Sequence, residues 1–230
     1  MNDFPFDVVG FDLDGTLLDT SRDLGEALNH ALDVAGRPAV AVESVARLIG
    51  GGGRQMLLRA LEESGGVPDD TAPLFDAFFA YYARNISVHS RLFPGGEAML
   101  DGLAARGVHL AVVTNKREDY AVQLLSDLGL APRFYTIIGG DTLGPGRAKP
   151  APDLLHEMLA RAGGARRAAY VGDTTFDTGA ARAAGLPCVA VSFGFNDLPP
   201  HELGAAAVID HYDELIPALL ELGEITAPVR

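Results

Sequence analysis

The stretch FDVVGFDLDGTLLDT, residues 6–20, decides the fold of this chain. Its apolar run Val8–Phe11 is too short for a typical helix and is typical of a strand buried on both faces of a parallel sheet. Asp12 and Asp14 follow directly, and Gly15 indicates the turn that ends the strand. In an extended strand, side chains at positions i and i+2 point to the same face, so we expect the two carboxylates to lie close together and to repel each other. Two acids at the carboxyl end of a buried strand indicate a cation.

The next segment has the periodicity of helices. In SRDLGEALNHALDVAG the apolar residues recur on one helical face, and the pattern ends at Gly36 and Pro38. That face comprises Leu24, Ala27, Leu28, Ala31, Leu32 and Ala35. Further helices are expected over residues 43–49, 54–64 and 70–86, and the aromatic side chains of the last one are interpreted as core. We therefore predict an all-helical block, residues 20–88, inserted after the first strand.

From Pro94 onward the pattern alternates between helix and strand. The expected strands are VHLAVVT (108–114), FYTIIGG (134–140), AAYVGD (168–173), PCVAVS (187–192) and AAVID (206–210). The expected helices cover residues 97–105, 119–128, 153–162, 176–184 and 212–222. This alternation implies a parallel sheet with helices on both faces. The predicted fold class is α/β, a doubly wound parallel sheet formed by residues 1–19 and 89–230, with residues 20–88 as an inserted helical cap domain.

The composition argues against several classes of protein. A formal net charge of −13 argues against a nucleic acid or an anionic membrane as partner, because both need basic patches. No apolar run is long enough to span a membrane, and the N-terminus lacks the pattern of a secretory signal. The single cysteine, Cys188, is typical of a reducing compartment, so we expect a cytoplasmic protein. Any anionic substrate of so acidic a chain requires a local cation.

Polar residues follow the predicted strands at their carboxyl ends, where doubly wound sheets bind ligands. Thr114 and Asn115 end one strand, Asp173 ends another, and Asp177 follows one helical turn later. Lys149 lies between these segments in RAKPAPD. Carboxylate ligands without nearby imidazoles or thiols favour Mg²⁺ over Zn²⁺. The sequence therefore predicts a magnesium site at this edge of the sheet, with a substrate phosphate beside it.

In chain order, DLDGT, TN, KP and GDTTFD resemble the four motifs of haloacid dehalogenase-superfamily phosphatases. With FDLDGTLLDT, IGGGG, VVTNK and VGDTTFD the chain is similar in particular to the phosphoglycolate phosphatases of bacteria, over essentially its full length. The resemblance implies a Rossmann-like core and a magnesium-dependent phosphomonoester hydrolase that acts through an aspartyl-phosphate. A small anionic metabolite is the expected substrate, 2-phosphoglycolate is the first candidate, and a monomer or homodimer is expected.

The resemblance also implies a role for each motif residue. Asp12 would be the nucleophile, and Asp14 would protonate the leaving group and then activate water. Mg²⁺ would be held by Asp12, the backbone carbonyl of Asp14 and Asp173, with Asp177 in support. Lys149 would neutralise charge on the nucleophile and on the phosphoryl group.

Two further segments are assigned to substrate binding. Thr114 and the backbone amide of Asn115 would bind phosphate oxygens. In IGGGGRQML, residues Gly51 and Gly52 either form a plain flexible turn or belong to a cap loop that folds over the substrate. In the second case Arg54 is available to bind an anionic group, and a substrate carboxylate could pair with it in bidentate fashion.

Other functions stay open at this point. Dehalogenases lack the second aspartate of DLDGT, so Asp14 disfavours them. A phosphatase for a sugar phosphate or for pyrophosphate, and a phosphomutase of similar build, remain alternatives, because the cap decides among them. A non-catalytic binding protein on the same fold is the remote alternative.

Overall fold

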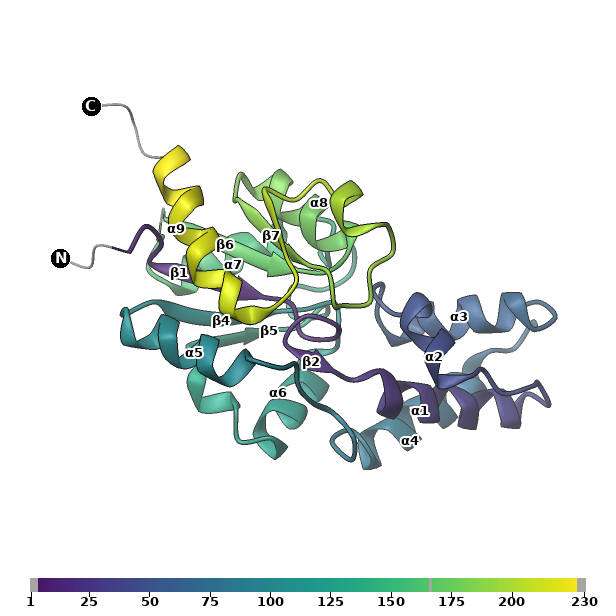
Figure 1. The fold of residues 1–230 in the computed structure, drawn as a ribbon. Helices are drawn as coiled ribbons and strands as arrows, with labels where there is room; N and C mark the ends of the chain where they lie inside the picture. Colours follow the sequence, from purple (N-terminus) through teal and green to yellow (C-terminus); the bar gives the residue numbers. More distant parts are fainter. Residues whose placement is uncertain (1–3, 166, 227–230) are drawn as a thin grey trace.

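Strand β1 (Val8–Phe11) runs through the centre of a six-stranded sheet in the computed structural model, which describes residues 4–165 and 167–226 (Figure 1). All four of its residues are buried, as expected for a strand covered on both faces. The other strands of this sheet are β4 (His109–Val113), β5 (Thr136–Ile138), β6 (Ala168–Gly172), β7 (Cys188–Val191) and β8 (Ala207–Ile209). Every pairing is parallel, in the order β5-β4-β1-β6-β7-β8, which confirms the predicted fold class.

The register of the three central strands positions the polar residues that follow them. Val8 of β1 pairs with His109 of β4 on one side and with Ala168 of β6 on the other. The three strands therefore end at nearly the same level, and their carboxyl ends meet at one edge of the sheet. Asp12, Thr114 and Asp173 are each the first residue beyond these ends.

Helices cover both faces of the sheet. Alternate side chains of β1 enter two separate apolar clusters: Val9 and Phe11 enter one, and Val8 enters the other. The first cluster includes α5 (Gly96–Ala105), α6 (Glu118–Asp127) and α9 (Leu215–Thr226). The second includes α7 (Asp153–Arg161) and α8 (Thr175–Ala184). The predicted doubly wound arrangement follows from these two layers.

The expected helical block lies beside the carboxyl ends of the strands (Figure 1). It contains α1 (Ser21–Val34), α2 (Val42–Val45), a 3-10 turn at Ala46–Leu48, α3 (Gly53–Glu63) and α4 (Ala72–Arg84). Five of the six residues predicted for the apolar face of α1 are buried, and Ala35 is half-buried just beyond the helix end. Among the described residues, no helix has the length and apolar character needed to cross a membrane.

A short antiparallel ribbon, which the sequence did not predict, joins the two chain segments that lead into and out of the helical block. It pairs β2 (Leu18–Asp19) with β3 (Arg91–Leu92). Close by, the buried carboxylate of Asp23 accepts hydrogen bonds from the backbone N–H groups of His89, at 3.0 Å, and Ser90, at 2.8 Å. The Ser90 hydroxyl donates to the same carboxylate at 2.7 Å. The start of α1 is thereby bound to the returning chain.

Replacing Asp23 with Ala should lower the free energy of unfolding by about 3 kcal/mol, because buried N–H donors lose their acceptor. Urea denaturation followed by circular dichroism measures this change. Asp33→Ala on the same helix is the matched control, since Asp33 is exposed and its loss should cost less than about 0.5 kcal/mol. Equal small losses in both variants would contradict a stabilising role for Asp23.

Candidate functional site

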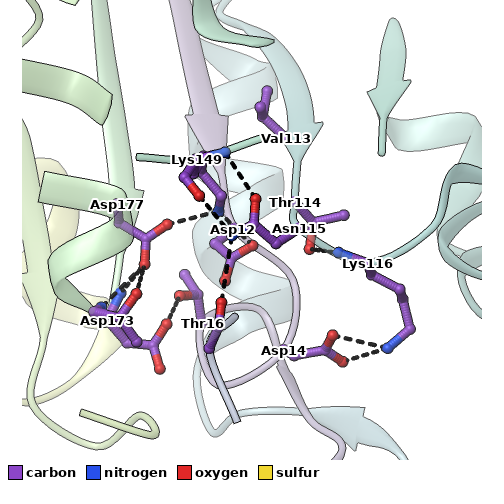
Figure 2. Close-up of polar contacts among 12 residues, drawn as sticks. Asp12, Asp14, Thr16, Val113, Thr114, Asn115, Lys116, Lys149, Asp173 and Asp177 are labelled. Atoms are coloured by element: carbon purple, nitrogen blue, oxygen red, sulfur yellow. Dashed lines mark hydrogen bonds and ion pairs between the residues drawn. The ribbon is translucent and has the colours of Figure 1, made fainter. Parts of the chain in front are cut away.

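A buried lysine lies between two carboxylates at the carboxyl edge of the sheet (Figure 2). Nζ of Lys149 is 2.8 Å from Oδ1 of Asp12 and 2.6 Å from Oδ1 of Asp177. It also donates to the hydroxyl of Tyr170, at 2.8 Å. Burial alone would lower the pKa of Lys149, but the two carboxylates outweigh it and raise that pKa. Lys149 is therefore a permanent positive charge beside Asp12.

The strands on either side of β1 hold this lysine in place. The side chain of Asn115, after β4, accepts from the backbone N–H of Lys149 at 2.9 Å and donates to its carbonyl at 3.0 Å. Tyr170 of β6 donates its hydroxyl proton to the carbonyl of Val113 at 2.6 Å and is thereby oriented toward Nζ. The side chain of Asn115 thus positions Lys149, while phosphate binding by its backbone amide stays a prediction.

Three buried carboxylates form an acidic cluster around this point. Asp12, Asp173 and Asp177 each offer one oxygen, and these oxygens all lie within 4.8 Å of one another. Asp173 accepts from the hydroxyl of Thr16 at 2.8 Å and from the backbone N–H of Phe195 at 2.7 Å. Burial, and then the nearby charges of Asp177 and Asp12, raise the pKa of Asp173 well above its ordinary value.

Asp177 has more hydrogen-bond partners than Asp173, whose two oxygens accept one hydrogen bond each. Oδ1 faces Lys149, and Oδ2 accepts from the backbone N–H and the hydroxyl of Thr174 at 3.0 and 2.7 Å. With Thr174 it forms the capping box that begins α8. A supporting role fits this geometry better than direct ligation of a metal.

The cluster fits a hard divalent cation. The cluster holds three carboxyl groups and one ammonium, so ionisation of all three acids requires a further positive charge. Oδ1 of Asp12 is buried, and its nearest charged partner is Nζ of Lys149 at 2.8 Å. Oxygen donors alone are the ligand set that Mg²⁺ prefers. Asp12 and Asp173 are therefore the residues suited to hold such an ion.

Asp14 belongs to a second ionic group, which differs from the expectation for an extended strand. Because β1 ends at Phe11, Asp14 lies in the following turn and its carboxylate points away from Asp12 (Figure 2). Both of its oxygens accept from Nζ of Lys116, at 2.7 and 2.8 Å, and Oδ1 also accepts from the hydroxyl of Thr20 at 2.8 Å. Each acid of DLDGT thus has its own lysine. Burial, the largest influence, raises the pKa of Asp12 to about 6, and repulsion by Asp14 contributes less.

A cavity of about 270 Å³ opens between this edge of the sheet and the helical block. Asp12, Asp14 and Thr114 line it from the sheet side. Its remaining lining includes residues 50–54 of the glycine-rich loop, several aromatic side chains, Lys116 and Arg117. The cavity therefore combines acids from the sheet with positive charges that offset the net charge of the chain locally.

The glycine-rich loop approaches the sheet closely. Gly52 has a φ of +86°, and a Cβ at this position would lie 3.1 Å from the carbonyl oxygen of Asn115. Gly51 lines the same cavity, where a Cβ would meet the flexible side chain of Gln55. The structure thus brings Gly51, Gly52 and Asn115 together, as expected for a cap loop over the site.

Arg54 and the aromatic helix α4 form the far wall. The guanidinium of Arg54 lies 4.0 Å from the ring centroid of Phe75, and the residue is exposed while lining the cavity. Phe78, Phe79 and Tyr82 also line it. The interpretation of this helix as core is therefore incomplete, because one side of it faces the cavity.

Sequence reasoning missed Lys116, Tyr82 and Tyr170. Lys116 follows the TN motif directly, so its place just beyond a strand end is a usable signal, but its side chain is absent from the residues assigned to the site. Tyr82 was assigned to the core of the aromatic helix. Tyr170 lies within a buried strand, and nothing in the pattern indicates that its hydroxyl reaches Lys149.

Comparisons with known proteins confirm the resemblance that the four sequence motifs indicate. Residues 9–191 match the family model of the haloacid dehalogenase-like hydrolases. A phosphoglycolate phosphatase from Agrobacterium fabrum is 42% identical over 92% of this chain and 91% of its own length. A phosphoglycolate phosphatase from Mesorhizobium japonicum is 40% identical over 93% of this chain and 95% of its own length. The crystal structure of a predicted phosphoglycolate phosphatase from Haemophilus somnus has a TM-score of 0.87 at 29% identity, and the match covers 94% of this chain and 98% of that one.

Lys149→Met should destabilise the metal-free protein by about 3–5 kcal/mol at pH 8, because buried carboxylates lose their cation. Lys149 lowers the pKa of Asp12, so its removal raises that pKa further above 6. A raised carboxyl pKa means that the folded state binds more protons than the unfolded state, so stability falls as pH rises toward that pKa. The loss should therefore be smaller at pH 5 than at pH 8, as measured by urea denaturation in chelator.

Arg147→Met is the control for this experiment. Arg147 precedes Lys149 on the same loop, but its side chain is 57% exposed and pairs with Asp153 at the surface. We expect a change below about 0.5 kcal/mol at either pH. A loss for Lys149→Met that is the same at both pH values would contradict the charge argument.

Proposed function

The chain belongs to the haloacid dehalogenase-like hydrolase family and is a phosphatase, and from that premise we propose that it hydrolyses 2-phosphoglycolate, with Mg²⁺, through an aspartyl-phosphate on Asp12. The observation that carries the proposal is the position of Asp12. It lines the cavity, it forms an ion pair with Lys149, and it lies within 4.8 Å of oxygens of Asp173 and Asp177. A carboxylate so placed has a substrate space beside it and, in the Lys149 ammonium, a charge that favours its ionised form.

The proposed reaction has two steps. A carboxylate oxygen of Asp12 attacks phosphorus, the bond from phosphorus to the ester oxygen breaks, and Asp14 gives a proton to the departing alkoxide. Asp14 then removes a proton from water, which attacks the same phosphorus, releases inorganic phosphate and restores Asp12. Bound Mg²⁺ would supply charge neutralisation for phosphate oxygens.

Other residues of the chain orient and stabilise the phosphoryl group in this proposal. Thr114 lines the cavity beside Asp12, and we assign it, with the backbone amide of Asn115, to phosphate oxygens. Lys149 stabilises the negative charge that develops on them, and Asp177 holds Lys149 in position. Because phosphoryl transfer depends mainly on positioning and charge, these groups suffice for the chemistry.

We propose that residues 20–88 act as the cap that selects the substrate. The rest of the chain, residues 1–19 and 89–230, is assigned to the catalytic core. Within it, residues 1–3, 166 and 227–230 lie outside the described residues. The cap contributes Gly51, Gly52 and Arg54 to the cavity wall, and a volume of about 270 Å³ suits a small metabolite. Relatives named phosphoglycolate phosphatases support 2-phosphoglycolate as that metabolite.

Activity on a panel of phosphorylated compounds separates this proposal from the alternatives. Hydrolysis of 2-phosphoglycolate in preference to sugar phosphates and pyrophosphate supports it. Transfer of the phosphoryl group to a sugar hydroxyl in place of water would indicate a phosphomutase. A cytoplasmic location, a monomeric or homodimeric state and the absence of nucleic acid or membrane partners stay predictions.

Asp12→Asn should abolish turnover of p-nitrophenyl phosphate while leaving the protein folded, because an amide neither attacks phosphorus nor carries the charge that binds a cation. Steady-state kinetics measure the loss, and the melting temperature controls for folding. Retention of more than about a tenth of wild-type kcat/KM, or a barrier change below about 1.4 kcal/mol, would overturn the assignment of the nucleophile.

Chelation should remove activity, and Mg²⁺ should restore it, whereas Zn²⁺ should substitute poorly. Mg²⁺ should also raise the melting temperature of the wild type without substrate, and Asp173→Asn should reduce that rise. Because the pKa of Asp12 is raised to about 6, protons compete with the cation below this pH, so the rise should shrink from pH 7.5 to pH 5. Full activity in excess chelator would contradict a magnesium requirement.

A further inference from the structure

Two polar groups belong to residues that line the cavity and have no assigned contact with the phosphoryl group in the proposed reaction. One is the ammonium of Lys116, whose side chain is only 5% exposed although it lines the cavity. The other is the hydroxyl of Tyr82, which is buried and has no hydrogen-bond partner among the described residues. A buried hydroxyl without a partner is costly, so its presence at a cavity wall needs an explanation.

The two groups are adjacent. Nζ of Lys116 lies 4.8 Å from the ring centroid of Tyr82. Burial, the largest influence, would lower the pKa of Lys116, but the nearby charge of Asp14 outweighs it, so the ammonium stays charged. An ammonium has three N–H donors, and the contacts to Asp14 use two of its directions. The ammonium also interacts with the nearby hydroxyl of Tyr82, and the O–H of Tyr82 is the donor left without an acceptor in the described part of the chain.

The wall of the cavity opposite Lys116 is also positively charged. Gly51, Gly52 and Gly53 line the cavity where α3 begins, and Gly52 provides no side chain to cap this eleven-residue helix. The first N–H groups of a helix lack intrahelical acceptors and carry partial positive charge. Arg54 and Arg117 add full positive charges to the lining. An anionic group inside the cavity would therefore meet donors on both sides.

We propose that Lys116 and Tyr82 bind the carboxylate of the substrate while its phosphate lies at Asp12 and Thr114. The proposal rests on the proposed function, and it assigns the ligand as a short phosphomonoester with a carboxylate near the phosphate. The Lys116 ammonium and the Tyr82 hydroxyl both donate to that carboxylate, and the N-terminus of α3 adds favourable charge. Arg54 lies exposed over Phe75 and attracts the anion from the rim without making the direct contact.

The test compares two substrates that differ only at the proposed contact. In ethyl phosphate a methyl group replaces the carboxylate of 2-phosphoglycolate, and the phosphoryl group is the same. The quantity measured is the ratio of kcat/KM for 2-phosphoglycolate to kcat/KM for ethyl phosphate. Lys116→Met also removes the partner of Asp14 and should slow both substrates, but only loss of the carboxylate contact changes their ratio.

Tyr82→Phe is the decisive variant, because it removes only the unpartnered hydroxyl. It should lower the substrate ratio by about tenfold, the loss expected for a hydrogen bond to a charged group. Its melting temperature should change little, since the hydroxyl has no acceptor among the described residues. Lys116→Met should lower the ratio by about tenfold or more. Tyr81→Phe is the matched control: Tyr81 is the neighbouring residue, stacks on His30 and does not line the cavity, so the ratio should not change.

The possible failures are distinguishable. A wild-type protein that shows no preference for 2-phosphoglycolate over ethyl phosphate would overturn both the proposed substrate and this binding site. A wild-type preference that survives in Tyr82→Phe and Lys116→Met would leave the proposed function intact and overturn the site. If Arg54→Ala alone abolishes the preference, the carboxylate binds at the rim and the assignment to Lys116 and Tyr82 is wrong.

Discussion

The buried ion pair of Lys149 with Asp12 and Asp177 is the interaction on which the rest of the site depends. An ammonium and two carboxylates removed from water are stable only if their geometry is nearly complete. The partners come from three separate segments, which are the end of β1, the loop before α7 and the first turn of α8. Asn115 and Tyr170 complete the arrangement from the two strands that flank β1. The site can therefore form only when the sheet is correctly assembled.

A second lysine, Lys116, offsets the repulsion between two carboxylates that lie close together in the sequence. Asp12 and Asp14 are separated by a single leucine, yet Lys149 neutralises one and Lys116 neutralises the other. The chain leaves the extended strand after Phe11, and the two carboxylates then point in different directions (Figure 2). One acid then belongs to the carboxylate cluster suited to a cation, and the other belongs to the wall of the cavity.

The helical block contributes chemistry of a different kind. It supplies apolar and positively charged walls to the cavity, and none of its side chains belongs to the carboxylate cluster. The chain enters and leaves it through the β2–β3 ribbon, next to the hydrogen bonds of Asp23, and Tyr120 and Gln123 of α6 hydrogen-bond to backbone carbonyls of α4. This separation is consistent with a division between a sheet edge that performs the reaction and a block that recognises the substrate.

The sequence by itself determined the α/β architecture and the residues at the strand ends. Both follow from local patterns, namely the apolar run of β1, the alternation of helix and strand, and the rule that parallel strands end at one edge. Only the tertiary structure decided which side chains meet there. Asp14 and Lys116 are 102 residues apart, and Thr16 and Asp173 are 157 apart. Local periodicity carries no information about such contacts, because sheet register and turn geometry set them. For the same reason, the aromatic pattern of α4 could not show that Tyr82 faces a cavity with its hydroxyl unpaired.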